Sequence, residues 1–394
     1  MPMASSYVGD RLVSDADSHL MESPSWLYEY ADSSTRALLP EMNLEVGGAG
    51  AEQQIADAVS RERSVSVTEL SGSSLVSGPK GWGALGAMSG EDRSVALDVL
   101  GFRQQLVFST FASTQYLFSK DLDLVYGGSA AHNRGIAEFC AHDDRLLPVA
   151  SLPLNDLDQA ERTLDTALEL GCAAMWIPYR PVAGHSPAHI DVDRIWARIA
   201  DAGVPFVLHI GGGRSTLNRA FHDNGRPRPV DAHGGGENLR AKDYASTHHG
   251  VETFLSCLLL DGVFERHPGL RCGVIELGAS WVPGFLRIVD SAVRSFGRNE
   301  PMLQELSMLP SEYARRQIRF TPFHFEDVGW LIDQGGPELF LFSSDYPHPE
   351  GGRDPLGKFE ASLDHHGIGD DARQRFYSRN FEDLITVSRK EKVA

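Results

Sequence analysis

Carboxylate and imidazole side chains stand at the ends of short apolar runs in this sequence. Asp17 and His19 are two residues apart in the segment DADSH, and alternate residues of a strand point to the same face. A carboxylate and an imidazole on one face form a two-point clamp for a divalent metal ion. A turn in which Asp17 caps the chain and His19 is solvated gives the same triplet, so this motif alone leaves both interpretations open.

Three further polar residues close apolar runs in the same way. His209 ends PFVLH before three glycines, Glu276 follows LRCGVI, and Asp345 follows ELFLFSS. Taken singly, a core histidine or a turn-capping carboxylate would explain each of them. A buried carboxylate, however, needs a metal ion, a cation or a proton to offset the cost of its burial. His348, three residues after Asp345, can reach the same cavity.

The elements that must position these residues are short runs rich in strand-forming residues, separated by amphipathic stretches. Eight candidate strands cover residues 11–15 (which lead into the first), 104–109, 146–152, 173–177, 205–210, 270–276, 317–321 and 339–344. Helix candidates between them include residues 156–170, 191–202, 282–296 and 326–334. This alternation favours a (β/α)8 TIM-like barrel over an open sheet. Because barrel enzymes hold their active sites at the carboxyl ends of the strands, the polar residues are expected to meet at one mouth.

Two long glycine-rich stretches exceed a minimal barrel. They cover residues 33–101 and 211–250. Long segments after barrel strands are usually lids or oligomer arms rather than independent domains. We therefore predict a single domain over residues 1–394 with two insertions, and a homo- or hetero-oligomer.

Charge and composition exclude several classes of partner. The chain of 394 residues carries 54 acidic against 36 basic side chains, a formal charge of −18, which repels nucleic-acid and anionic lipid phosphates. The four cysteines show no CxxC spacing and are interpreted as buried thiols in a reducing compartment. The N-terminus lacks a signal-peptide pattern, and the apolar run 254–260 is far shorter than the roughly 20 residues of a membrane span. We expect a cytoplasmic protein with a small-molecule substrate, no nucleic acid and no membrane.

Several of these segments resemble the amidohydrolase superfamily. They are DADSH, VLHIGGG, FERHPGLRCGVIELGASWVPGFLRIVD and SSDYPHPEG, and AHNRGIAEFCAHDDRLLPVASLPLNDLDQAERTLDTALELG is similar to the same group. The nearest branch is the amidohydrolase-related one, similar to aminocarboxymuconate-semialdehyde decarboxylase. The resemblance covers most of residues 12–30 and 92–384, outside the two insertions. It implies a (β/α)8 barrel with a divalent metal held by Asp17, His19, His209 and Asp345, with Asp345 doubling as general acid or base.

The sequence departs from that family pattern at two positions. Many members carry HxH on the first strand, where this chain has Asp17 and His19; a carboxylate there shifts the preference from zinc toward manganese or iron. Glu276 replaces the catalytic histidine of the sixth strand, so Glu276 is a candidate for a catalytic group and for a metal ligand.

A histidine pair adds further candidates. His248 and His249 precede a helix candidate, and one histidine at this place resembles a substrate or metal contact of the branch, although helix capping explains the pair equally well. We take His249 as a candidate catalytic residue and metal ligand, and His248 and Arg214 as candidate substrate-binding residues. With His249 and His348 included, the mouth would hold three carboxylates and four imidazoles, which is what a two-metal, oxygen-activating centre needs.

Three functions are consistent with these residues. The first is a mononuclear zinc, manganese or iron enzyme that hydrolyses or non-oxidatively decarboxylates a small carboxylate-bearing substrate. The second resembles unusual superfamily members: a dinuclear iron or iron–manganese monooxygenase that hydroxylates a small acid or natural-product intermediate. The third is a non-catalytic partner subunit that kept the barrel and some ligands.

Overall fold

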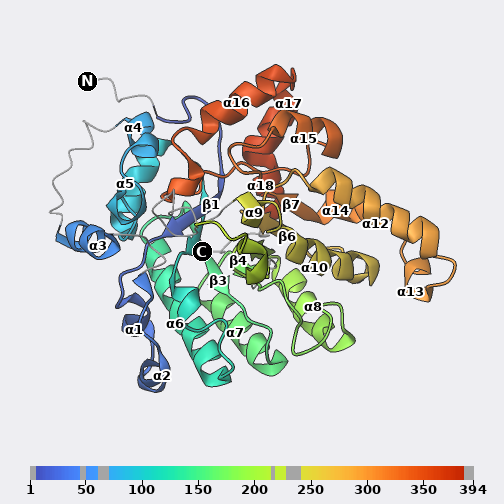
Figure 1. Cartoon of the computed structure of the whole chain (residues 1–394), viewed down its shortest axis with the longest axis horizontal. Coiled ribbons are helices and arrows are strands. Elements are labelled where there is room, and N and C mark those ends of the chain that lie inside the picture. The colour runs from blue at the N-terminus through green and yellow to red at the C-terminus, as the bar shows by residue number, and fades with distance from the viewer. Residues whose placement is uncertain (1–5, 45–49, 61–70, 214–217, 228–240, 386–394) are drawn as a thin grey trace, which may run out of the picture.

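The described part of the protein folds as a mixed α/β structure with seven parallel strands surrounded by helices (Figure 1). The computed structural model describes residues 6–44, 50–60, 71–213, 218–227 and 241–385. The strands are β1 (Asp15–Leu20), β2 (Gln105–Ser109), β3 (Leu146–Ser151), β4 (Ala174–Trp176), β5 (Phe206–His209), β6 (Cys272–Ile275) and β7 (Ile318–Phe320). Their order in the sheet follows the chain, as repeated β–α–β crossovers require.

The eighth predicted strand, residues 339–344, is not confirmed as a strand. The segment still lies between the two ends of the sheet: Leu341 N–H donates to the Phe320 carbonyl of β7 (2.9 Å), and Ala16 N–H of β1 donates to the Phe342 carbonyl (3.1 Å). Other amides of the segment bond elsewhere, because Phe342 N–H donates to the Phe376 carbonyl (2.9 Å). The segment therefore joins β7 to β1 by isolated bridges instead of a continuous ladder.

The first strand lies further along the chain than predicted. Residues 11–15 lead into it as expected, but β1 runs from Asp15 to Leu20, so Asp17 and His19 are inside the strand and not at its end. All six residues of β1 are buried, so this polar segment runs through the interior of the protein. The alternation of a strand then points Asp17 and His19 to the same face.

Helices cover the outside of the sheet. The four predicted ones are confirmed as α7 (Leu157–Glu169), α8 (Asp193–Ala202), α12 (Val282–Phe296) and α15 (Val328–Gly335). Their ends follow local rules: the Asp156 side chain accepts the Gln159 N–H at the start of α7, and α8 ends at Gly203 with φ 70°. The remaining outer helices are α6 (Leu122–Cys140), α10 (His249–Leu260), α11 (Val263–Arg266), α13 (Pro301–Gln304), α14 (Pro310–Gln317), α16 (Pro355–His365), α17 (Asp370–Gln374) and α18 (Asn380–Ile385).

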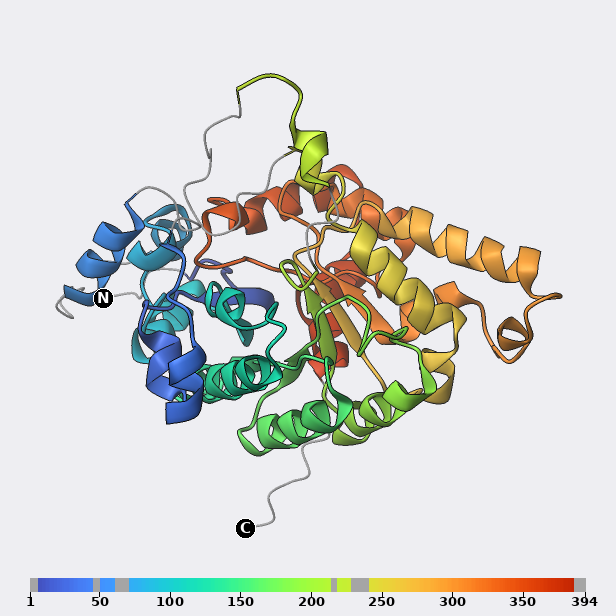
Figure 2. The same cartoon turned by 60° about the horizontal axis from the view of Figure 1, so that its bottom comes forward.

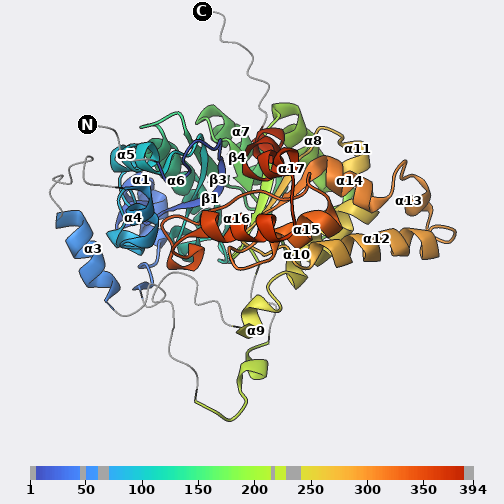
Figure 3. The ribbon, with the colours of Figure 1, turned by 90° about the horizontal axis from the view of Figure 1, so that it is seen from above.

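The two regions predicted as insertions differ in the described structure. After α1 (Trp26–Tyr30), the described part of residues 33–101 forms α2 (Ser33–Leu38), α3 (Ala51–Ser60), α4 (Gly72–Ser77) and α5 (Gly90–Leu100), so it is mostly helical. The described part of residues 211–250 contains a short turn of helix at Arg219–His222 and α9 (Ala241–Tyr244), on one side of the fold (Figures 2 and 3). Tyr244 of α9 packs against Phe323, with ring centroids 5.7 Å apart.

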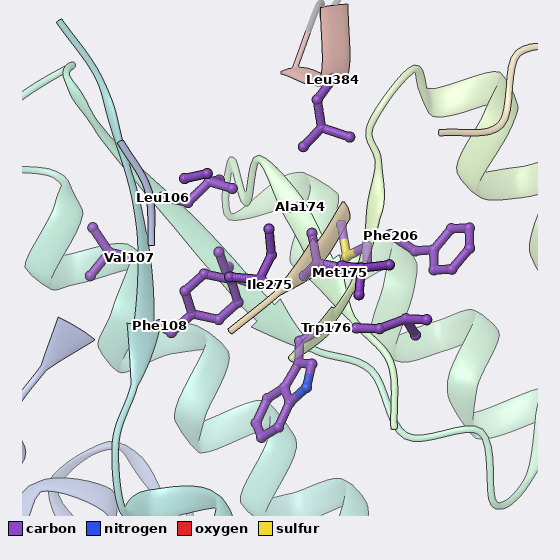
Figure 4. Close-up of a cluster of buried hydrophobic side chains, with 14 of the residues drawn as sticks. Leu106, Val107, Phe108, Ala174, Met175, Trp176, Phe206, Ile275 and Leu384 are labelled. Carbon is purple, nitrogen blue, oxygen red and sulfur yellow. The ribbon is translucent and has the colours of Figure 1, made fainter. Parts of the chain in front are cut away.

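The core of the sheet is apolar and closes beneath the polar residues. Leu106 and Phe108 point to one side of β2 and Val107 to the other (Figure 4). Trp176 of β4 and Leu384 of α18 lie at opposite ends of this cluster, and all five side chains are buried. Phe108 also lies against the ring of His209, with the two ring centroids 4.4 Å apart, so apolar surface borders the polar residues. In the part of the chain that the structure describes, no helix has the length and apolar character needed to cross a bilayer.

Candidate metal centre

Six of the predicted site residues come together in one buried cluster. Two are on β1, one ends β5, one follows β6, and two lie in the segment that joins β7 to β1; they are Asp17, His19, His209, Glu276, Asp345 and His348. None of the six is more than 7% exposed. The cluster consists of two overlapping groups of potential ligand atoms, each within 4.8 Å of one another: Asp17, His19, His209 and Glu276, and His19, Glu276, Asp345 and His348.

The ligand atoms approach one another closely. His19 Nε2 lies 3.2 Å from Asp17 Oδ1 and 3.5 Å from Asp345 Oδ1. His209 Nε2 lies 3.4 Å from Asp17 Oδ1 and 3.4 Å from Glu276 Oε2. These separations are those of atoms that surround a common point, as ligands of one ion do.

Outer hydrogen bonds fix the orientation of two imidazoles. His19 Nδ1 faces the Ser109 carbonyl at 3.3 Å, and His209 Nδ1 faces the Ile210 carbonyl at 2.9 Å. A carbonyl oxygen only accepts, so Nδ1 of each ring carries the proton and donates. The Nε2 lone pairs of His19 and His209 therefore point into the cluster, as in histidines that bind a metal.

The inward-facing atoms are therefore hydrogen-bond acceptors that need a cation. His19 Nε2 and Asp345 Oδ1 are buried, and among the described residues no donor reaches either atom. Buried acceptors that face one another repel unless a positive charge lies between them. A divalent metal ion fits this set of imidazole and carboxylate donors, and the mixture suits manganese, iron or zinc.

The local electrostatics agree with this fit. Burial and the nearby Asp17 carboxylate raise the pKa of Asp345. Burial lowers the pKa of His19 to about 4 and that of His348 to about 3. Near neutral pH the two imidazoles are thus neutral and able to bind metal, while Asp345 holds a proton until a cation displaces it.

Backbone strain coincides with two of the carboxylates. Ala183, Glu276 and Asp345 are the non-glycine residues with positive φ in the described chain, and the last two, at 54° and 50°, belong to the cluster. Such conformations cost about 1–3 kcal/mol each and persist where surrounding contacts enforce them. Here Glu276 N–H donates to Thr321 Oγ1 (2.8 Å), and Asp345 N–H donates to the Asp17 carbonyl (2.9 Å). The strain aims both carboxylates into the cluster.

One supporting carboxylate is absent from the sequence prediction. Asp15 accepts from Ser344 N (2.8 Å), Ser344 Oγ (2.5 Å) and Gln105 Nε2 (2.7 Å), and burial raises its pKa to about 7. It ties β1 and β2 to the segment that carries Asp345. The motif DADSH contained the residue, but no pattern in the sequence distinguishes the supporting Asp15 from the ligand candidate Asp17.

Two cations also went unpredicted, and both come from the first insertion. Arg93 of α5 is fully buried and donates to the His19 carbonyl (2.5 Å) and the Gly86 carbonyl (2.8 Å). Its guanidinium lies 5.1 Å from the Tyr346 ring centroid, and Lys80 Nζ lies 5.9 Å from the same centroid. The insertion thus packs two cations around the residue next to Asp345. No local sequence signal distinguishes Arg93 or Lys80 from solvated surface charges.

The remaining predicted residues lie elsewhere. His248 and His249 form a separate, less buried group with Glu252 at the start of α10, and neither belongs to the two buried groups. The His248 ring stacks on Trp281, with centroids 5.7 Å apart. Their predicted roles in catalysis and binding stay predictions. Arg214 lies outside the described residues.

Comparison with known proteins identifies the family. Residues 115–384 match the model of a family described as amidohydrolase, so the chain belongs to the amidohydrolase family. It is therefore an enzyme of that family, and the alternative of a non-catalytic partner subunit loses its support. No curated protein sequence matches the chain.

Solved structures similar to this chain share its fold. An amidohydrolase of Mycobacterium avium subsp. paratuberculosis is 20% identical, with a TM-score of 0.71 and coverage of 96% of this chain and 98% of the other. A 5-carboxyvanillate decarboxylase of Sphingomonas paucimobilis is 15% identical, with a TM-score of 0.58 and coverage of 96% and 99%. A dihydroxybenzoic acid decarboxylase of Polaromonas sp. JS666, with bound manganese and 2-nitroresorcinol, is 14% identical, with a TM-score of 0.60 and coverage of 97% and 99%.

Proposed function

We propose that this enzyme uses a divalent metal ion to remove a carboxyl group, without oxidation, from a small carboxylate-bearing substrate. Hydrolysis is the alternative reaction of the same centre. The observation that carries the proposal is the buried cluster in which imidazole lone pairs and carboxylates face one another. Structures similar to this chain include decarboxylases of 5-carboxyvanillate and dihydroxybenzoate, which favours decarboxylation over hydrolysis.

Five residues of the cluster would bind the ion, and one of them, Asp345, would also transfer a proton. Asp17, His19 and His209 would hold the ion from one side, and Asp345 and Glu276 from the other. A bound divalent ion supplies Lewis-acid chemistry, because it polarises substrate oxygens and offsets the negative charge that develops as carbon dioxide leaves. Phe108 and Trp176 border His209 with apolar surface, which keeps water from the reacting carbon.

Asp345 is the residue that best fits proton transfer. Asp345 would give up its proton when the ion binds; because burial and Asp17 raise its pKa, its carboxyl group would be able to take up a proton again from water near neutral pH once substrate is bound. When the bond between the substrate and its carboxyl group breaks, the electron pair stays on the substrate carbon. Asp345 then delivers its proton to that carbon, and a new C–H bond replaces the lost C–C bond. The reaction balances without an oxidant.

The test uses manganese-loaded enzyme with 2,6-dihydroxybenzoate and 5-carboxyvanillate in deuterated water. We expect carbon dioxide release and one deuterium at the carbon that lost it, with neither product from Asp345→Asn. Release of carbon dioxide without deuterium at that carbon would contradict the proton role of Asp345. Absence of release from these acids and from a panel of amino and aromatic carboxylates, by enzyme that holds its metal, would contradict decarboxylation; cleavage of ester or amide probes would then identify a hydrolase.

A second candidate function rests on the overlap of the two ligand groups. Glu276 belongs to both groups, and a carboxylate has two oxygens with which to bridge two ions. Two ions of iron, or one of iron and one of manganese, would favour a monooxygenase that hydroxylates a small acid or natural-product intermediate. Oxygen consumption by iron-loaded enzyme with substrate acid and an external reductant tests this candidate. One ion per chain and no oxygen consumption would exclude it.

We propose one domain over residues 1–394 with the topology of a (β/α)8 barrel, in which the bridging segment 339–346 takes the place of the eighth strand. Assembly into an oligomer, a cytoplasmic location and a small-molecule substrate stay predictions.

A further inference from the structure

His348 sits at the edge of the cluster with both ring nitrogens close to oxygen atoms. Its Nε2 lies 3.0 Å from Thr110 Oγ1, and its Nδ1 lies 2.9 Å from Asp345 Oδ1. The ring stacks on His19, with centroids 3.9 Å apart and planes at 22°. The ring is therefore held in place, and what remains open is which nitrogen carries the proton.

The hydroxyl of Thr110 decides this question. A threonine hydroxyl has one hydrogen to donate and can accept as well. Thr110 Oγ1 lies 2.9 Å from the Leu20 carbonyl, which only accepts, and 3.5 Å from Met21 Sδ, a weak acceptor. With its hydrogen on the Leu20 carbonyl, Thr110 Oγ1 must accept from His348 Nε2–H. The lone pair of His348 is then on Nδ1, and it faces Asp345.

Glu22 holds Thr110 in this position. The carboxylate of Glu22 is fully buried and accepts three successive backbone N–H groups: Oε1 from Thr110 (3.0 Å) and Ala112 (3.1 Å), and Oε2 from Phe111 (3.1 Å). Trp82 of the first insertion donates its indole N–H to the Glu22 carbonyl (2.9 Å). The Trp82 ring also stacks on Phe111, with centroids 5.0 Å apart, so the loop after β2 is held by Glu22 on one side and Trp82 on the other.

We propose that Thr110, anchored by Glu22, is a positioning residue that keeps the proton of His348 on Nε2 and so makes Nδ1 a metal-binding atom beside Asp345. This inference rests on the proposed function, because it assumes that the cluster binds a divalent cation. Two bare acceptors at this distance repel, so the Nδ1 lone pair and Asp345 Oδ1 need either a proton or a cation between them, and the ion takes the place of that proton when it binds. A histidine that binds a metal donates its other ring N–H to a partner that fixes its orientation. Thr110, itself held by Glu22, is that partner for His348.

The test compares two substitutions of Thr110 with a control in the same loop. Thr110→Val keeps the shape and removes the hydroxyl, and Thr110→Ser keeps the hydroxyl. Thr114→Val is the control, because Thr114 Oγ1 donates to the nearby Phe111 carbonyl (2.7 Å) and makes no hydrogen bond to His348 in the part of the chain that the structure describes. The readouts are the ¹⁵N chemical shifts of His348 in metal-free protein, assigned with His348→Gln, and the affinity for Mn²⁺.

We expect the wild-type spectrum to show a neutral ring with the proton on Nε2, and Thr110→Val to lose this preference. Mn²⁺ affinity should fall about 10- to 100-fold in Thr110→Val and stay close to the wild-type value in Thr110→Ser and Thr114→Val. A proton on Nδ1 in the wild type, or wild-type affinity in Thr110→Val, would overturn the inference. If Thr110→Val does not fold, the wild-type spectrum alone still tests which nitrogen of His348 carries the proton. Failure of the wild type to bind any divalent ion would contradict the proposed function instead, whatever the spectrum shows.

Discussion

Charged side chains gather at both ends of the sheet, but they are arranged in opposite ways. At the amino ends of β1 and β2 lies a cleft of about 890 Å³, and six charged residues of its lining pair with one another: Arg11, Arg103, Glu360, Asp364, Arg373 and Glu382. Arg373 lies 2.8 Å from Glu360, which Arg11 also approaches to 3.0 Å, and Arg103 lies 2.7 Å from Glu382. Each of these acids has a basic partner within the same cleft.

At the metal-centre end, acids face acids and imidazole lone pairs. Asp17, Glu276 and Asp345 converge on the same imidazoles, and two of these three carboxylates are held by strained backbone. Paired charges at a surface add little to stability and need no further explanation. Buried charges of one sign destabilise the empty fold, so their retention indicates a role that only a bound cation completes. The charges at the amino ends of β1 and β2 therefore serve the fold, and the charges at the metal centre serve binding.

The largest expected effect comes from breaking the metal-centre end. Asp345→Asn removes a ligand and the proton carrier, so turnover should fall by at least about a thousandfold. The same change relieves repulsion with Asp17, so the metal-free variant should melt no lower than metal-free wild type. Steady-state kinetics and thermal unfolding after chelation measure the two effects. A large loss of stability in the metal-free variant would mean that Asp345 stabilises the fold, which would contradict the view that charges at the metal centre serve binding.

Removal of the metal should have the next largest effect. A ligand that binds only the folded state at a thousand times its dissociation constant stabilises that state by about 4 kcal/mol. We expect chelated wild type to unfold at lower temperature than Mn²⁺-loaded wild type, and the difference to disappear in Asp17→Ala. Equal melting temperatures with and without Mn²⁺ would count against a cation in the cluster.

Metal affinity should depend on pH in a definite direction. The imidazoles of His19 and His348 are neutral well below pH 7, because burial lowers their pKa to about 4 and about 3. The raised pKa of Asp345 means that its proton is the one a metal must displace. Affinity for Mn²⁺ should therefore rise with pH by at most about tenfold per unit between about pH 6 and pH 8, and level off above the raised pKa. Titration calorimetry in this range measures it, and Asp345→Asn should flatten the curve.

The smallest effect is expected at the opposite end. Glu360→Gln keeps the size of the side chain and removes the charge that Arg11 and Arg373 approach. We expect a loss of about 1 kcal/mol or less in the free energy of unfolding, because the pairs are partly solvated. Metal content and turnover should stay at wild-type values. A change in metal content would show that the two ends are not independent.

The sequence predicted the parts of the site that follow from local pattern. His209 and Asp345 were found because a polar residue closes an apolar run, and helix boundaries such as that after Asp156 follow from capping. The strand expected at residues 339–344 is not confirmed, because amides of this segment bond to Phe376 and Asp15 as well as to neighbouring strands. Only the folded structure decides such partners.

Residues that act through tertiary contacts were not found in the sequence. Arg93 and Thr110 are far from the cluster along the chain, and each contacts it from a helix or loop whose position depends on the whole fold. The overlap of two ligand groups was also beyond the sequence, because it depends on the positive φ of Glu276 and Asp345. Distances between side chains, not residue types, decide how many ions the cluster can hold.

Metal content per chain is the most direct test of the central claim that this cluster binds a divalent cation. Elemental analysis should use protein produced with manganese, iron and zinc supplied and never exposed to chelator, beside Asp17→Ala prepared in the same way. We predict about one ion per chain for the decarboxylase, or about two irons or an iron–manganese pair for the second candidate, and a clear loss in Asp17→Ala. Negligible metal in the wild type, or an unchanged content in Asp17→Ala, would contradict the assignment of the site.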